Sequence, residues 1–78
     1  MFSREHTNLI QKLARQCLER GILLVTAESC TGGLLSSLLT QEAGSSKWFD
    51  RGFVTYSNNS KIDSLGVQGE TLENFGAV

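Results

Sequence analysis

Four side chains able to do chemistry lie in one short stretch, Glu28-Ser29-Cys30-Thr31, and two glycines follow them. Serine and cysteine are nucleophiles, and a carboxylate can move protons. The residues before them, 22–27, are almost wholly apolar and rich in branched side chains, which predicts a buried strand. Ligands of open α/β sheets bind where strands end. The sequence therefore predicts that any active site lies at this turn.

A serine nucleophile needs a base, and the only histidine, His6, is far from the turn in sequence. Neither a Gly-x-Ser-x-Gly pattern nor a P-loop is present, so a Ser-His-Asp triad within this chain is not expected. A lysine amine can replace the histidine if burial or a cationic neighbour favours its neutral form. Tyr56 lies near the end of a second predicted strand and Lys61 lies just beyond it, and strand pairing would bring both beside Ser29.

The turn also offers backbone donors. If a helix begins at residues 31–33, its first N–H groups are free and could bind an anion or an oxyanion. Gly32 and Gly33 would let a ligand approach the backbone closely.

Structural roles compete with these chemical ones. The turn side chains could cap the next helix, and Glu28 could bind backbone N–H groups instead of handling protons. Three further residues also have a structural interpretation. Cys30 could be a small buried side chain, Tyr56 could be half-buried and packed on its strand, and Lys61 could be solvated. His6 is expected at the surface, whereas Trp48 and Phe49 are expected in the core.

The elements that position these residues alternate between helix and strand. A helix over 7–20, capped by Thr7 and ended by Gly21, would bury one apolar face. This face comprises Leu9, Ile10, Leu13, Ala14, Cys17 and Leu18. A second helix would begin near Thr31 or Gly32 and run to about Thr40, with Leu34, Leu35, Leu38 and Leu39 inward. A loop (41–47), a strand (48–57), a short helix (61–65, ended by Gly66) and a turn (72–75, capped by Thr71) complete the chain.

Composition narrows the function classes. The 78 residues provide for one domain, and a net charge of −1 without a basic stripe makes nucleic acid an unexpected partner. The charged segment 1–20 predicts neither a signal peptide nor a membrane span, so we expect a cytoplasmic protein with Cys17 and Cys30 reduced. Two strands alone make a poor sheet, which indicates an unfinished fold.

Several blocks, read together, resemble the CinA C-terminal domain family, which includes the PncC-type nicotinamide-nucleotide amidases. The blocks are Ala27-Glu28-Ser29-Cys30-Thr31-Gly32-Gly33, Gly44-Ser45-Ser46, Phe49, Arg51-Gly52-Phe53-Val54-Thr55-Tyr56-Ser57-Asn58, Lys61, Leu65-Gly66-Val67 and Gly76-Ala77-Val78. The resemblance implies a three-layer α/β/α fold with a mixed sheet. Residues 1–78 would be a single partial, truncated domain of that kind, running helix-strand-helix-strand and then short helices.

The same resemblance implies hydrolysis of nicotinamide mononucleotide, a small-molecule nucleotide, to nicotinic acid mononucleotide and ammonia, without a cofactor or metal. Ser29 would be the nucleophile, Lys61 its base, and Tyr56 a hydrogen-bonding partner. Backbone N–H groups around Cys30, Thr31, Gly32 and Gly33 would stabilise the oxyanion. Side chains of Thr31, Ser45 and Ser46 would contact substrate.

Two departures from the family pattern affect this expectation. Asn59-Ser60 replaces a common Glu-Ala pair before the lysine, and the later Thr-Gly-Ile-Ala-Gly-Pro and Lys-Pro-Val-Gly segments are absent. An alternative is therefore an inactive remnant that acts as an interaction module or homo-oligomer through exposed sheet edges. A generic phosphate-binding fragment is a third interpretation.

Overall fold

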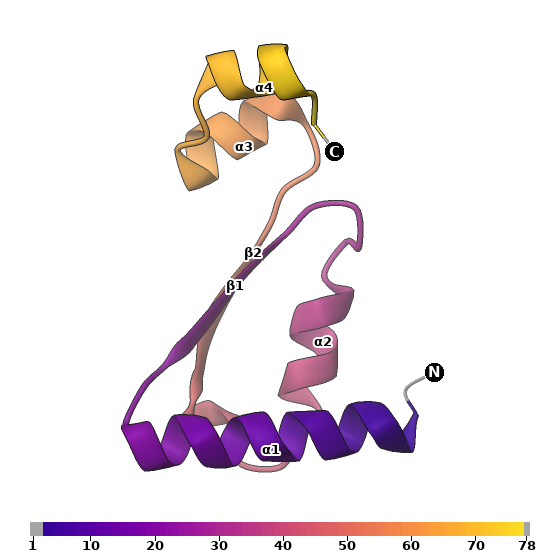
Figure 1. Cartoon of the computed structure of the whole chain (residues 1–78), viewed down its shortest axis with the longest axis vertical. Coiled ribbons are helices and arrows are strands. Elements are labelled where there is room, and N and C mark those ends of the chain that lie inside the picture. Colours follow the sequence, from indigo (N-terminus) through magenta and orange to yellow (C-terminus); the bar gives the residue numbers. More distant parts are fainter. Residues whose placement is uncertain (1–2, 78) are drawn as a thin grey trace.

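The computed structural model describes residues 3–77, and Figure 1 shows their arrangement. In chain order the elements are α1 (Arg4–Arg20), β1 (Leu24–Glu28), α2 (Leu34–Thr40), the 3-10 helix η1 (Ser45–Lys47), β2 (Phe49–Val54), α3 (Asn58–Leu65) and α4 (Gly69–Phe75). The predicted α/β class is confirmed.

The two strands pair in parallel and are aligned from Val25–Arg51 to Glu28–Val54, with a register shift between Leu24 and Val25. Parallel pairing places both carboxyl ends at one edge of the sheet. In Figure 1 this edge lies toward α3 and α4, and α1 crosses the opposite end.

The core is built where α1 meets the start of β2. Its buried side chains are Ile10, Ala14, Cys17, Leu39 and Trp48. Trp48 is only 1% exposed, and its ring meets that of Phe49 edge to face at 6.5 Å. The predicted core position of Trp48 is confirmed, and Phe49 is partly buried and packs against this core.

Helix α1 begins earlier than predicted. Ser3, not Thr7, is the N-cap: its Oγ accepts a hydrogen bond from the His6 N–H, and His6 Nδ1 accepts one from the Ser3 N–H. This reciprocal pair resembles a capping box. Gly21 ends the helix as predicted, with a φ of 63°. Leu9 and Leu18 were predicted inward but are exposed, because the stripe that faces the core is the narrower one through Ile10, Ala14 and Cys17.

Helix α2 begins at Leu34, later than predicted, because Gly32 and Gly33 have φ values of 63° and 103°. These left-handed conformations cannot start a right-handed helix. The end at Thr40 agrees with the prediction. Leu39 is buried, whereas Leu34 and Leu35 were predicted inward but are exposed.

The strands are shorter than the predicted ranges 22–27 and 48–57. Beyond Val54, Ser57 becomes the N-cap of α3, with its Oγ accepting from the Ser60 N–H, so α3 begins at Asn58. Its end at Gly66 agrees with the prediction. Helix α4 begins at Gly69 after Gln68, not after the predicted cap Thr71.

Helices α3 and α4 lie beyond the carboxyl ends of the strands, apart from α1 and α2 (Figure 1). None of the side chains of α4 is buried, and Lys61 is the buried residue of α3. Between residues 3 and 77 no helix has the length and apolar character needed to cross a membrane.

Candidate active site

The predicted turn, residues 29–33, leaves β1 at the edge of the sheet where β2 also ends. Glu28 pairs with Val54, and the carbonyl of Glu28 accepts a hydrogen bond from the Thr55 N–H at 2.9 Å. Gly32 and Gly33 then reverse the chain so that α2 runs back along the sheet (Figure 1). The topology therefore presents the turn at the position where open α/β sheets bind ligands.

Glu28 organises this turn from beneath. Its carboxylate is buried and accepts four hydrogen bonds. The donors are the Thr31 hydroxyl (2.6 Å), the Leu35 N–H (2.9 Å), the Ser36 N–H (3.0 Å) and the Ser36 hydroxyl (2.8 Å). The side chain thus satisfies the first turn of α2 from outside the helix, a role that the N-cap Gly33 has no side chain to perform.

These hydrogen bonds keep Glu28 ionised. The Thr31 hydroxyl contributes most, and the donors on Ser36 and Leu35 add to it against the opposing effect of burial. Together they lower the pKa of Glu28 from 4.5 to about 2. A carboxylate with so low a pKa is a poor proton carrier near neutral pH. Of the two interpretations of Glu28, the geometry favours the cap.

Ser29 lies half-buried at the start of the turn, and residues 3–77 offer its hydroxyl no hydrogen-bond partner. The N–H of Gly32 is bonded back to the Ser29 carbonyl at 3.4 Å. Within the same described residues, the N–H groups of Cys30, Thr31 and Gly33 meet no acceptor. A nucleophile without a partner therefore lies beside unpaired backbone donors, which is the combination that acyl transfer uses.

Tyr56 and Lys61 reach the same end of the molecule, but no hydrogen bond joins either of them to Ser29. Tyr56 is 80% exposed, and its backbone N–H donates to Ser60 Oγ. Lys61 is buried, at 6% exposure, and its Nζ donates to the Ala77 carbonyl at 3.2 Å. The structural interpretations predicted a half-buried Tyr56 and a solvated Lys61. The structure instead has an exposed Tyr56 and a buried Lys61.

Ser45 and Ser46 are not brought to the turn. Both belong to η1, which precedes β2, whereas Ser29 lies at the strands' carboxyl ends. The length of β2, about 17 Å at ~3.3 Å per residue, separates them. The predicted contact of these serines with the same substrate is therefore not supported within one chain.

The two cysteines differ in exposure. Cys17 is buried in the core, and Cys30 is exposed in the turn. The structural interpretation of Cys30 as a small buried side chain is wrong, because the chain leaves the sheet before this residue. No group of three or more histidine, cysteine, aspartate or glutamate side chains gathers as a metal site in the part of the chain that the structure describes.

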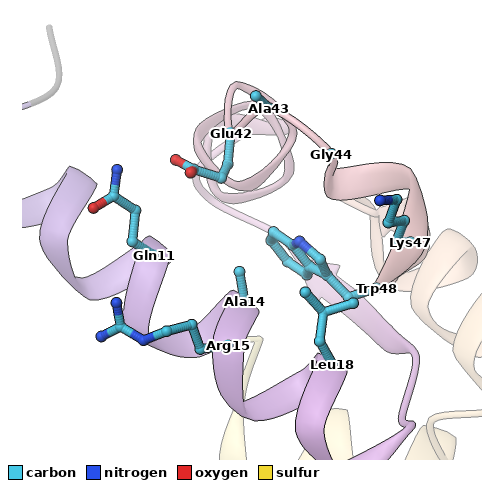
Figure 2. A pocket seen from close by; sticks show the side chains of 9 residues that line it. All are labelled: Gln11, Ala14, Arg15, Leu18, Glu42, Ala43, Gly44, Lys47 and Trp48. Carbon is cyan, nitrogen blue, oxygen red and sulfur yellow. The ribbon is translucent and has the colours of Figure 1, made fainter.

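Two features were not found by sequence reasoning. Thr26 and Ser36 bond through their hydroxyls at 2.8 Å and so tie β1 to α2 behind the turn. A cavity of about 320 Å³ also lies between α1 and residues 42–48, with the Trp48 ring between the two walls (Figure 2). This cavity is at the amino end of β2, away from the turn. Neither feature has a local sequence signal, because both depend on elements that meet only in the fold.

Comparison with known proteins agrees with this fold and turn. The family model described as the CinA C-terminal domain matches residues 6–78. The nicotinamide-nucleotide amidohydrolase PncC of Escherichia coli K12 is 47% identical over 78 residues, which cover all of this chain and 47% of that protein. A CinA-like protein of Syntrophobacter fumaroxidans is 62% identical over 60 residues, covering 77% of this chain and 14% of that protein.

Among solved structures, the competence/damage inducible protein CihA of Agrobacterium tumefaciens matches with a TM-score of 0.94 and 49% identity. The match covers all of this chain and 47% of that one. The α/β fold with its strand-to-helix turn thus has solved counterparts, and the chain belongs to the CinA C-terminal domain family. It spans less than half the length of each of these relatives.

Proposed function

We propose that this chain carries the nucleophile part of a nicotinamide-nucleotide amidohydrolase, which hydrolyses the carboxamide of nicotinamide mononucleotide. One observation carries the proposal: the Ser29 hydroxyl, which has no hydrogen-bond partner among residues 3–77, lies at the carboxyl end of β1. Beside it are the N–H groups of Cys30, Thr31 and Gly33, which are unpaired within the same range. The Escherichia coli relative, a nicotinamide-nucleotide amidohydrolase, supplies the substrate class.

The proposed reaction is acyl transfer. Ser29 Oγ attacks the carboxamide carbon while Lys61 accepts the hydroxyl proton, and the unpaired N–H groups of the turn stabilise the oxyanion. The proton then passes to the leaving nitrogen, and ammonia departs. Water hydrolyses the ester on Ser29 and releases nicotinic acid mononucleotide. Tyr56 would hydrogen-bond within this proton path, and the Thr31 hydroxyl, which donates to Glu28, would accept a hydrogen bond from the substrate.

The test is ammonia release from nicotinamide mononucleotide by this chain and by a Ser29→Ala variant. We expect Ser29→Ala to reduce release to the background rate, because the variant lacks the hydroxyl that forms the proposed ester. Ser37→Ala is the matched control, since Ser37 is an exposed hydroxyl on α2 away from the turn. Release that does not depend on Ser29 would contradict the proposal.

A second candidate function is an inactive interaction module. The hydrogen bond from Lys61 Nζ to the Ala77 carbonyl favours it, because this bond occupies the amine of the proposed base. Absence of any Ser29-dependent release, at concentrations where circular dichroism shows a folded chain, would leave this second function.

A further inference from the structure

The Thr31 hydroxyl uses its single proton inside the protein. Thr31 Oγ1 donates to Glu28 Oε1 at 2.6 Å, and the ionised carboxylate of Glu28 can only accept. The backbone N–H groups of Leu35 and Ser36 donate to the same carboxylate and hold it in place. Because a hydroxyl has one proton and two lone pairs, Thr31 Oγ1 can offer a ligand only an acceptor.

A chain of hydroxyl groups behind the turn has the same direction. Ser36 Oγ gives its proton to Glu28 Oε2 at 2.8 Å. The 2.8 Å contact between Thr26 Oγ1 and Ser36 Oγ is therefore a bond that Thr26 donates. All these protons point toward Glu28, so Thr31 could donate to a ligand only by breaking its bond to a buried carboxylate.

The acceptor on Thr31 is open to a ligand. Thr31 is exposed, and among residues 3–77 no group donates a hydrogen bond to its hydroxyl oxygen. Its own backbone N–H is unpaired within the same range. One residue, two positions after Ser29, thus offers both a hydrogen-bond donor and a hydrogen-bond acceptor.

This pair of groups matches a carboxamide better than a carboxylate. A carboxamide has an oxygen that accepts and an NH₂ group that donates, whereas both oxygens of a carboxylate only accept. A bound carboxylate would place one oxygen against Thr31 Oγ1 with no proton between them, close to the negative charge of Glu28.

We propose that Thr31 is a specificity-determining residue, whose hydroxyl oxygen accepts from the NH₂ group of nicotinamide mononucleotide and so selects it over nicotinic acid mononucleotide. This inference rests on the proposed function and adds to it the group that distinguishes the amide from the acid. The selection works by exclusion, because the acid leaves an acceptor facing an acceptor.

The test is binding, measured by isothermal titration calorimetry in a Ser29→Ala background. This background removes the proposed nucleophile and leaves Thr31 in place, so affinity is measured without turnover. We expect nicotinamide mononucleotide to bind about tenfold more tightly than nicotinic acid mononucleotide, because only the amide satisfies the hydroxyl oxygen.

Variants at one position separate the hydroxyl from the shape of the side chain. Thr31→Val, which has a similar shape without the oxygen, should reduce the ratio of the two affinities by about tenfold. Thr31→Ser keeps the hydroxyl and should keep the preference. Thr7→Val is the matched control, since the Thr7 hydroxyl donates to the Ser3 carbonyl on α1, away from the turn, and its loss should leave the ratio unchanged.

Proton NMR of the ligand-free parent chain gives a measurement that depends neither on binding nor on how variants fold. The Thr31 hydroxyl proton should be protected from exchange with water by its bond to Glu28 and give a resolved resonance.

The outcomes separate this inference from the proposed function. A preference for the amide without any ammonia release would support the selection and contradict the hydrolysis. Equal affinities, binding of neither nucleotide, a preference that Thr31→Val retains, or an unprotected Thr31 hydroxyl proton would each overturn the inference.

Discussion

At the scale of single residues, Glu28 links acidity to folding. Its pKa is lowered to about 2 in the fold from 4.5, so the unfolded chain takes up the proton first as pH falls. The stability that Glu28 contributes is therefore fully present above about pH 4.5 and is lost as pH falls toward 2. Glu28→Gln should lower the urea midpoint at pH 7, and its difference from the parent chain should shrink over this acid range.

The measurement is urea unfolding of both proteins at a series of pH values. Glu19→Gln, at an exposed position on α1, is the control and should follow the parent curve. If the Glu28→Gln and parent curves kept a constant separation down to about pH 2, the carboxylate would not be the charged cap that its four hydrogen bonds indicate.

At the scale of elements, the fit between β2 and α2 depends on Gly52. A Cβ at this position would lie 2.5 Å from Ser36 Oγ and 2.7 Å from Thr26 Oγ1, two atoms that are hydrogen-bonded to each other. Gly52→Ala should therefore separate strand from helix and lower the free energy of unfolding by about 1–3 kcal/mol.

Denaturant unfolding measures this effect, and two further variants define it. Gly69→Ala is the control: its added Cβ would meet nothing within 4 Å, so it should be neutral or slightly stabilising in α4. Ser36→Ala in the Gly52→Ala background should recover part of the loss, because it removes the nearer of the two atoms. If Gly52→Ala did not lower the free energy of unfolding, β2 and α2 would be able to move apart without loss of stability.

The accuracy of sequence-based reasoning differs between the two ends of each helix. Gly21 and Gly66 stop α1 and α3 as predicted, because a helix end in the left-handed conformation is a local property of glycine. The start of α2 was misplaced, since Glu28 caps it from a neighbouring strand, which no local pattern records.

The residues of the candidate site also differ in how well the sequence predicts their positions. The turn at Ser29 could be predicted, because an apolar run that ends in polar residues and glycines is a local signal. The burial of Lys61 could not, since it depends on how α3 and α4 pack against each other and on the Ala77 carbonyl. The displacement of Ser45 and Ser46 from the turn follows from the direction of β2, which only strand pairing determines.

At the scale of the whole molecule, the core and the candidate site lie at opposite ends of the sheet. The buried apolar side chains come from α1, α2 and Trp48, whereas α3 and α4 contribute none. Elements with few buried apolar contacts open at lower free energy than the global unfolding reaction. The end of the molecule that carries Tyr56 and Lys61 should therefore be the less stable one.

Two spectroscopic signals should consequently fail to coincide during unfolding. Trp48, the one tryptophan, is 1% exposed and reports the core by its fluorescence. Far-ultraviolet circular dichroism reports all helices, including α3 and α4. We expect part of the helical signal to be lost at lower urea concentration than the fluorescence change, because α3 and α4 unfold before the core. Coincident transitions would instead show that both ends of the molecule unfold as one cooperative unit. Phe75→Ala is the control, since this side chain is 79% exposed and its removal should shift neither transition.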